Sequence, residues 1–121
     1  MKTFLELAQS NLCELMAETA EVNKLNGWDR CTHEDYTDMV MGNVAAVRKV
    51  CTCLALIHTE VAEATEAVRK GDEPNFEEEL ADVVIRVLDL CEGLGVGLDA
   101  RVAEKLEKNR TRGLRHGGKI V

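Results

Sequence analysis

Residues 43–70, NVAAVRKVCTCLALIHTEVAEATEAVRK, form the longest stretch of this chain without glycine or proline. Alanine, leucine, glutamate, lysine and arginine, which are good helix formers, make up much of it. Gly42 precedes the stretch and the turn sequence GDEP (71–74) follows it, so we predict one long helix from about Asn43 to Lys70. A helix of that length in a short chain favours an all-helical fold.

Helical patterns continue on both sides of this stretch. Apolar spacing and turn residues predict further helices at about residues 3–25, from 34 onward, at 75–92 and at 99–112. Asn75 has the position of an N-cap, with Glu78 in capping-box position. Short loops make successive helices antiparallel neighbours. The predicted fold is therefore all-α, an antiparallel four-helix bundle-type protomer with one helix broken near Gly42.

The composition agrees with a single helical domain over residues 1–121. The chain is 45% hydrophobic and contains 3% aromatic residues and one proline. No apolar run approaches the roughly 20 residues that span a bilayer, and the N-terminus lacks a signal-peptide core, so we expect a cytoplasmic protein. The five cysteines form no C-x-x-C pair, and we predict that they are reduced and mostly buried.

Charge is divided unevenly along the chain. Residues 1–100 carry 8 Lys/Arg and 20 Asp/Glu, a net charge of −12, whereas residues 101–121 carry 7 and 2, a net charge of +5. An acidic body does not suit broad nucleic-acid binding, which needs an extended positive surface. Metal ions held by the acidic body and a small anionic ligand held by the basic end suit this distribution better.

Three glutamates recur at every third residue in HTEVAEATE (58–66), and a helical wheel separates them. With about 100° per residue, Glu60 lies in the middle of the apolar stripe of the long helix. Glu63 lies about 60° away at the edge of the stripe, and Glu66 lies about 120° away among polar residues. Because a buried carboxylate needs a cationic partner or a metal ion, Glu60 is the first candidate for a site.

The following helix supplies a second pair of acids, Glu79 and Asp82, on one face of an otherwise apolar segment. Arg86, one turn beyond Asp82, is placed to pair with that carboxylate, but one arginine cannot neutralise four acids. Ordinary buried ion pairing remains the alternative to a metal site. Oxygen ligands without His or Cys favour Mg²⁺ or Mn²⁺. A di-iron site is disfavoured because the sequence contains no Glu-x-x-His motif.

The last predicted helix gathers basic and amide side chains within an arc of about 100°: Arg101, Lys105, Lys108, Asn109 and Arg112. This arc is either a solvated basic face or, beside a carboxylate site, a surface that binds phosphate. Magnesium with Lys or Arg is the usual equipment for nucleotide phosphates. The sequence has no Walker-type glycine loop, so metals and side chains would hold the phosphates.

Together these motifs resemble the MazG-like, all-α nucleoside triphosphate pyrophosphatases. The family hallmark E-E-x-x-E, spacer, E-x-x-D is matched by TEVAE (59–63), fifteen residues and ELAD (79–82), with Thr59 in place of the first acid. The family's K-x-x-x-N-x-x-R element is matched by Lys105, Asn109 and Arg112. The resemblance covers residues 45–119, with core motifs at 45–112 and a glycine-rich basic tail at 113–121.

The resemblance implies Mg²⁺-dependent hydrolysis of a (deoxy)nucleoside triphosphate to monophosphate and pyrophosphate, for house-cleaning or control of the dNTP pool. The catalytic and metal-binding residues would be Glu60, Glu63, Glu79 and Asp82, with Mn²⁺ as a possible substitute for Mg²⁺. Lys105, Asn109 and Arg112 would bind the phosphates. The resemblance also implies a homodimer or a dimer of dimers with sites near the interface. We expect neither nucleic acid nor a membrane as a partner.

Two questions stay open at the level of sequence. Trp28, the only tryptophan, either stacks on a nucleobase or covers the end of the bundle. The chain is either an active pyrophosphohydrolase, a catalytically inactive or regulatory helical nucleotide-binding or interaction protein, or a hydrolase of another nucleotide phosphoanhydride. The four acids favour the first function, because an inactive protein has no need to keep costly core carboxylates.

Overall fold

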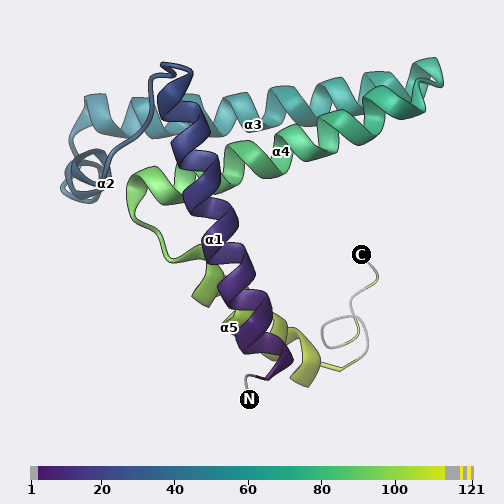
Figure 1. Cartoon of the computed structure of the whole chain (residues 1–121). Helices are drawn as coiled ribbons and strands as arrows, with labels where there is room; N and C mark the ends of the chain where they lie inside the picture. Colours follow the sequence, from purple (N-terminus) through teal and green to yellow (C-terminus); the bar gives the residue numbers. More distant parts are fainter. Residues whose placement is uncertain (1–2, 114–117, 119, 121) are drawn as a thin grey trace.

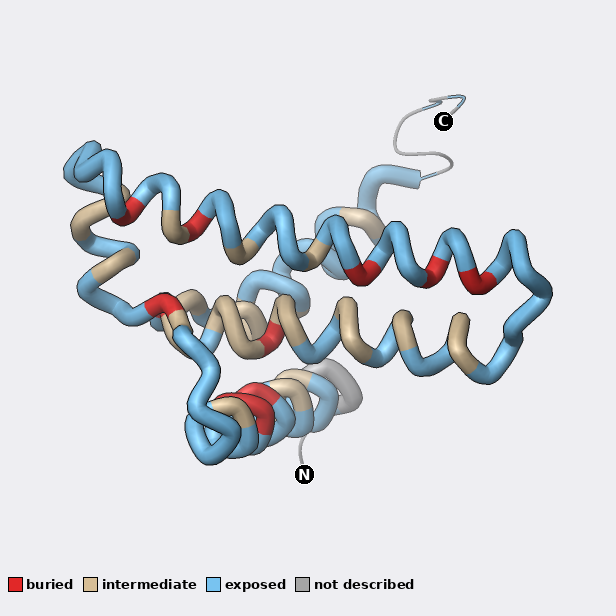
Figure 2. Tube along the Cα trace, turned by 90° about the horizontal axis from the view of Figure 1, so that it is seen from above, coloured by how far each residue is buried: buried red, intermediate tan, exposed pale blue. Residues whose placement is uncertain are grey.

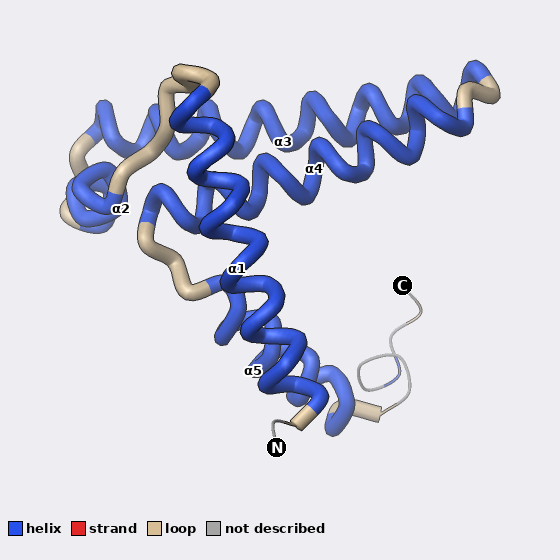
Figure 3. Tube along the Cα trace, viewed as in Figure 1, coloured by secondary structure: helices blue, strands red, loops and turns tan. Residues whose placement is uncertain are grey.

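The computed structural model describes residues 3–113, 118 and 120, although not the side chains of residues 4 and 5 (Figures 1 and 3). Five helices follow one another: α1 (Phe4–Leu25), α2 (His33–Val40), α3 (Val44–Lys70), α4 (Glu73–Leu94) and α5 (Leu98–Thr111). The described part of the chain contains no strand. The predicted all-α fold is confirmed. The predicted tail at 113–121 lies largely outside the described residues.

Helix α3 begins and ends at the residues that the sequence indicates. Asn43 is the N-cap, and its side-chain oxygen accepts a hydrogen bond from the Ala46 N–H at 3.0 Å. Gly71 ends the helix with φ 71°, a left-handed conformation that glycine adopts without steric cost. Gly42 breaks the chain before α3, and α2 and α3 are bent by 118° relative to each other. The predicted break near Gly42 is therefore present.

The start of α4 differs from the sequence prediction. Asp72 is the N-cap, and its carboxylate accepts the Asn75 N–H at 3.2 Å. Pro74 lies in the first turn, where its missing N–H costs nothing and its fixed φ suits the helix. Asn75 is therefore inside the helix, and its predicted role as an N-cap in a capping box with Glu78 is wrong.

The α3–α4 hairpin is the centre of the molecule (Figure 1). The two helices lie antiparallel, α1 crosses α4, and α2 packs against the first part of α3. Helix α5 turns away after α4 and lies along α1. The far end of the hairpin, around residues 67–77, projects beyond the other described helices in both views (Figures 1 and 2). A four-helix bundle is therefore not confirmed within one chain.

The buried core is small and lies where the α1–α2 loop meets the hairpin. Its centre is Cys31, Val50 and Leu94, against which Met39, Cys53, Leu90 and Val96 pack. Figure 2 shows the buried positions on the inner faces of the helices, separated by exposed ones. All five cysteines are free, as predicted. The prediction that they are mostly buried holds only in part, because Cys31 is buried, Cys53 and Cys91 are half-buried, and Cys13 and Cys51 are exposed.

Large apolar side chains are exposed on the hairpin. Four of them recur at seven-residue spacing along α3 and are 36–61% exposed; we call this set, Val47, Leu54, Val61 and Val68, the outer stripe. Helix α4 contacts α1, α2 and α3 but still exposes Leu80 and Val84. Among the described residues no single helix is long and apolar enough to span a membrane, and only the bent pair α2–α3 passes on length and composition when joined.

Candidate functional site

Glu60 is the buried acid of α3. It lies on the inner face of the helix with Ala64 and Ala67, and 8% of its surface is exposed. Glu66 is exposed, and its ion pairs are with Arg69 and Lys70 of the same helix at 3.9 and 3.8 Å. The helical wheel therefore separated these two glutamates correctly, since Glu60 is buried and Glu66 is exposed to solvent.

Helix α4 brings two more acids to Glu60. One carboxylate oxygen each from Glu60, Glu79 and Asp82 lies within 4.8 Å of the other two. Glu79 and Asp82 are half-buried and, being three residues apart, share the face of α4 that packs against α3. We call these three residues the acid cluster. The structure thus brings together three of the four predicted metal ligands.

Glu63, the fourth predicted ligand, lies at the rim of this cluster. It is exposed, one turn beyond Glu60 on α3. Its carboxylate is close enough to Glu79 to help raise the pKa of that group. Its position agrees with the predicted edge of the apolar stripe.

The acids of the cluster differ in electrostatic environment. Burial, and then the neighbouring carboxylates of Glu60 and Glu63, raise the pKa of Glu79 from 4.5 to about 7. The Arg86 guanidinium beside Glu60 instead lowers the pKa of that carboxyl. Oε2 of Glu79 is buried and has no hydrogen-bond partner among the described residues. Glu79 is therefore the member of the cluster that most lacks a cation.

The donor set fits a hard divalent cation. Carboxylate oxygens without nitrogen or sulfur donors are the ligands that Mg²⁺ and Mn²⁺ prefer. The buried Oε2 of Glu79 has no hydrogen-bond donor among the described residues. A metal ion held between Glu60, Glu79 and Asp82 would satisfy it.

Arg86 pairs across the two helices and not, as predicted, with Asp82 on its own helix. Its Nε donates to Glu60 Oε1 at 2.6 Å. Glu60 is the more buried acid, and an ion pair is stronger where less water screens it. The Arg86 side chain is 37% exposed, so this cation also reaches the open space beside the cluster.

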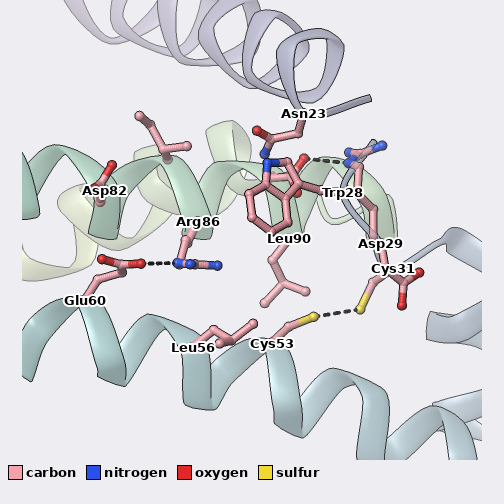
Figure 4. Close-up of a pocket in the computed structure, with 13 residues that line it drawn as sticks. Asn23, Trp28, Asp29, Cys31, Cys53, Leu56, Glu60, Asp82, Arg86 and Leu90 are labelled. Atoms are coloured by element: carbon pink, nitrogen blue, oxygen red, sulfur yellow. Dashed lines mark hydrogen bonds and ion pairs between the residues drawn. The ribbon is translucent and has the colours of Figure 1, made fainter. Parts of the chain in front are cut away.

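A cavity of about 380 Å³ opens there, with walls from α1, the α1–α2 loop, α3 and α4 (Figure 4). Glu60 and Asp82 lie at one end, and Trp28 lies toward the other. Leu56 and Leu90 line the part between them. This volume and mixed lining are typical of a site for a small molecule.

The end of the cavity away from the acids contains polar groups that the sequence prediction missed. Arg30 donates from Nε to Asp89 Oδ1 at 2.7 Å, and its Nη2 is buried with no hydrogen-bond partner among the described residues. A signal for Asp89 was present, because it follows Asp82 and Arg86 at helical spacing on one face of α4. Trp28 is 66% exposed and lines the same end.

The predicted phosphate-binding residues are not brought to the cluster of the same chain. Lys105, Asn109 and Arg112 belong to α5 or its C-cap, and α5 lies along α1, apart from the middle of the hairpin (Figure 1). Lys105 is exposed, whereas Oδ1 of Asn109 is buried and has no hydrogen-bond partner among the described residues.

The comparison with known families agrees with this geometry. Residues 48–114, more than half of the chain, match the MazG nucleotide pyrophosphohydrolase domain. The matched segment includes both pairs of acids and the three predicted phosphate-binding residues. No significant match was found among curated proteins or solved structures. The family generally depends on divalent metal ions, which suits the acid cluster. The chain belongs to the family of MazG nucleotide pyrophosphohydrolase domains.

Proposed function

We propose that this protein hydrolyses (deoxy)nucleoside triphosphates to the monophosphate and pyrophosphate in a Mg²⁺-dependent reaction. The observation that carries the proposal is the cavity with carboxylates of the acid cluster at one end and Trp28 toward the other. A triphosphate needs metal ions, and a base needs an aromatic or polar wall. Family membership supports the reaction class.

In this proposal Glu60, Glu79 and Asp82 hold the metal, and Glu63 joins them from the rim. The metal, when bound, lowers the pKa of water and offsets charge on phosphate oxygens. Glu79 is suited to binding it because Oε2 is buried without a hydrogen-bond donor among the described residues. One of the carboxylates accepts the proton of the water that attacks the α-phosphorus, and Trp28 stacks on the base.

We further propose that the active form is a homodimer or a dimer of dimers. The exposed outer stripe of α3 supports this, because an apolar row at seven-residue spacing is typical of a helix that packs on another helix. In such an assembly Lys105, Asn109 and Arg112 bind phosphate in the site of a neighbouring subunit. We also propose a cytoplasmic role in house-cleaning or dNTP-pool control.

The proposal is tested by incubating the purified protein with each of the dNTPs and NTPs, with and without Mg²⁺, and identifying both products. We expect pyrophosphate and a monophosphate in equal amounts, only with metal. The Glu79→Gln variant should lose at least about 100-fold in kcat, as expected when a ligand of a catalytic metal is removed. Glu66→Gln, a carboxylate change on the exposed face of α3, is the matched control and should retain wild-type activity.

Two results would contradict the proposal. If no triphosphate yields pyrophosphate, the chain acts on another nucleotide phosphoanhydride or has a regulatory role. If Glu79→Gln keeps the wild-type rate, the acid cluster is not the metal site.

A further inference from the structure

Arg86 lies where the acid cluster meets the cavity. Its Nε is 2.6 Å from Glu60 Oε1, and its side chain is more exposed than that of Glu60. Figure 4 places it between Glu60 and Asp82 on one side and Leu90 and Trp28 on the other. Arg86 is thus a fixed positive charge on the wall of the cavity, in the chain that also supplies the acids.

We propose that Arg86 has two successive partners: it neutralises Glu60 while no divalent ion is bound, and it binds the phosphate nearest the sugar once metal and nucleotide are present. This inference rests on the proposed function and adds a substrate-binding residue to it. The sequence motifs assign no such role to Arg86.

The first half of the proposal follows from competition for Glu60. A buried carboxylate needs a cation, and in the described residues Arg86 supplies it. A divalent ion held by the acid cluster would use the same carboxylate and would stand close to the guanidinium. Two like charges at such a distance repel each other, so metal binding weakens the hold of Glu60 on Arg86.

The second half follows from position and chemistry. A nucleotide with its base at Trp28 and its outer phosphates at the acid cluster must pass Arg86 (Figure 4). The group at that point is the phosphate attached to the sugar. A guanidinium binds phosphate oxygens through parallel hydrogen bonds and stays charged at every usable pH. The phosphate therefore takes the place of Glu60 as the anionic partner of Arg86.

The test separates metal binding from phosphate binding and does not depend on turnover. Mn²⁺ affinity without nucleotide is measured from the electron paramagnetic resonance signal of the free ion. Affinities for the four deoxynucleoside monophosphates and their nucleosides, with Mn²⁺ present, are measured from the fluorescence of Trp28, the only tryptophan. The variants are Arg86→Gln and Arg86→Lys. Arg69→Gln is the matched control, because Arg69 is an exposed arginine at the end of α3.

Arg86→Gln should bind Mn²⁺ at least about threefold more tightly, because the competing cation is gone. It should bind the preferred monophosphate about tenfold more weakly, the usual effect of losing a charged hydrogen bond, with nucleoside affinity unchanged. Arg86→Lys should keep the wild-type Mn²⁺ affinity within about twofold, since the charge remains, but should lose monophosphate affinity because an ammonium lacks the planar fork. Arg69→Gln should match the wild type in every measurement.

Opposite results would overturn the inference. If Arg86 is only part of a structural ion pair, Arg86→Gln should bind Mn²⁺ more weakly than the wild type and should lose monophosphate and nucleoside affinity alike. The inference also fails if the wild-type protein binds monophosphates no more tightly than nucleosides. If Arg86→Gln does not fold, as judged by circular dichroism, Arg86→Lys carries the test alone. An inactive wild-type protein would contradict the proposed function in the product assay, whereas these binding results judge Arg86 separately.

Discussion

Among single residues, Glu79 and Glu60 have opposite electrostatic environments within one cluster. The pKa of Glu79 is raised from 4.5 to about 7 by burial and by the acids beside it. The pKa of Glu60 is lowered, chiefly by Arg86. Charge on Glu79 therefore disfavours the folded state without metal, and charge on Glu60 favours it. The two effects act in different pH ranges, which makes them separable.

The metal-free protein should become less stable as pH rises from about 4.5 to about 7. Between these values folded Glu79 binds more protons than unfolded Glu79, so unfolding releases protons and becomes easier at higher pH. Urea midpoints between pH 5 and 8 in EDTA measure this trend. Because Glu60 contributes stability above 4.5 and loses it only at lower pH, it does not mask the effect.

Glu79→Gln is the control for other titrating groups, and the difference between variant and wild type isolates Glu79. Adding Mg²⁺ at pH 7.5 should raise the wild-type midpoint, because a ligand that binds only the folded state stabilises it. Equal pH dependence in both proteins would show that Glu79 is not the responsible group.

Trp28 should contribute to binding of the base and not to the chemical step. Trp28→Ala is expected to raise KM for the best triphosphate about tenfold, within the range for loss of one base–aromatic stack, while kcat changes by less than about threefold. Trp28→Phe should keep most of the affinity because its ring still stacks. A Trp28→Ala enzyme with unchanged KM would place the tryptophan in a covering role.

At the scale of elements, Gly93 sets how closely the α1–α2 loop approaches α4. A Cβ added at Gly93 would lie 2.3 Å from the backbone oxygen of Cys31 and 3.7 Å from Arg30 Nη2. Backbone cannot move aside as a flexible side chain can. The absence of a side chain at Gly93 therefore lets the loop place Trp28 and Arg30 along the cavity.

Gly93→Ala should destabilise the protein by about 1–3 kcal/mol, the usual cost of overpacking, although alanine in an exposed helix interior normally stabilises by about 0.5–1 kcal/mol relative to glycine. Whether the variant is less or more stable than the wild type therefore tells whether the α1–α2 loop is in tight contact with α4 at Gly93. Thermal or urea unfolding gives the stability, and KM reports the displaced loop. A variant more stable than wild type would show that loop and helix do not press on each other.

How far the sequence predicted these elements depends on whether the signal is local. The ends of α3 and the inward face of Glu60 were predicted correctly, because caps and helical periodicity are properties of a single segment. The sequence predicts Asn75 as the N-cap of α4 because Glu78 follows it in capping-box position, but Asp72 is an equally good cap and the helix begins after it. The partner of Arg86 depended on how α3 and α4 pack, which no local pattern contains.

The arrangement of the candidate site residues was predicted in part for the same reason. Spacing placed Glu79 and Asp82 on one face of α4, and packing on α3 then brought them to Glu60. The direction of α5 is set by the turn at residues 95–97 and by its packing on α1. The basic residues of α5 therefore share a helix face, as predicted, without reaching the acid cluster of their own chain.

At the scale of the whole molecule, one chain leaves much apolar surface uncovered. The far end of the hairpin projects beyond the other described helices (Figure 1), and the outer stripe of α3 stays exposed along its length. Monomeric proteins rarely expose apolar rows of this kind. The same chain keeps its basic α5 away from its own acids. A second copy packed on the outer stripe would cover this apolar surface, and its α5 would bring basic residues to the acid cluster of the first chain.

Val61→Lys should therefore dissociate the proposed assembly. Val61 is central in the outer stripe, and a lysine there would have to lose its water in the contact, which is costly for an unpaired charge. Light scattering with size-exclusion chromatography should show a shift to the monomer mass. Thr52→Lys is the matched control, because Thr52 is exposed on α3 about 180° from Val61 on the helical wheel. It should leave the mass unchanged.

Activity tells whether the assembly also completes the site. If α5 of one subunit binds phosphate for another, the Val61→Lys monomer should lose kcat/KM for triphosphates at least about tenfold, the effect of losing a charged phosphate contact, while its Mn²⁺ affinity persists because the acid cluster belongs to one chain. A monomer mass together with full activity would show that one chain forms a complete active site. An unchanged oligomer mass would show that the outer stripe is not the contact, because a buried, unpaired lysine could not be tolerated there.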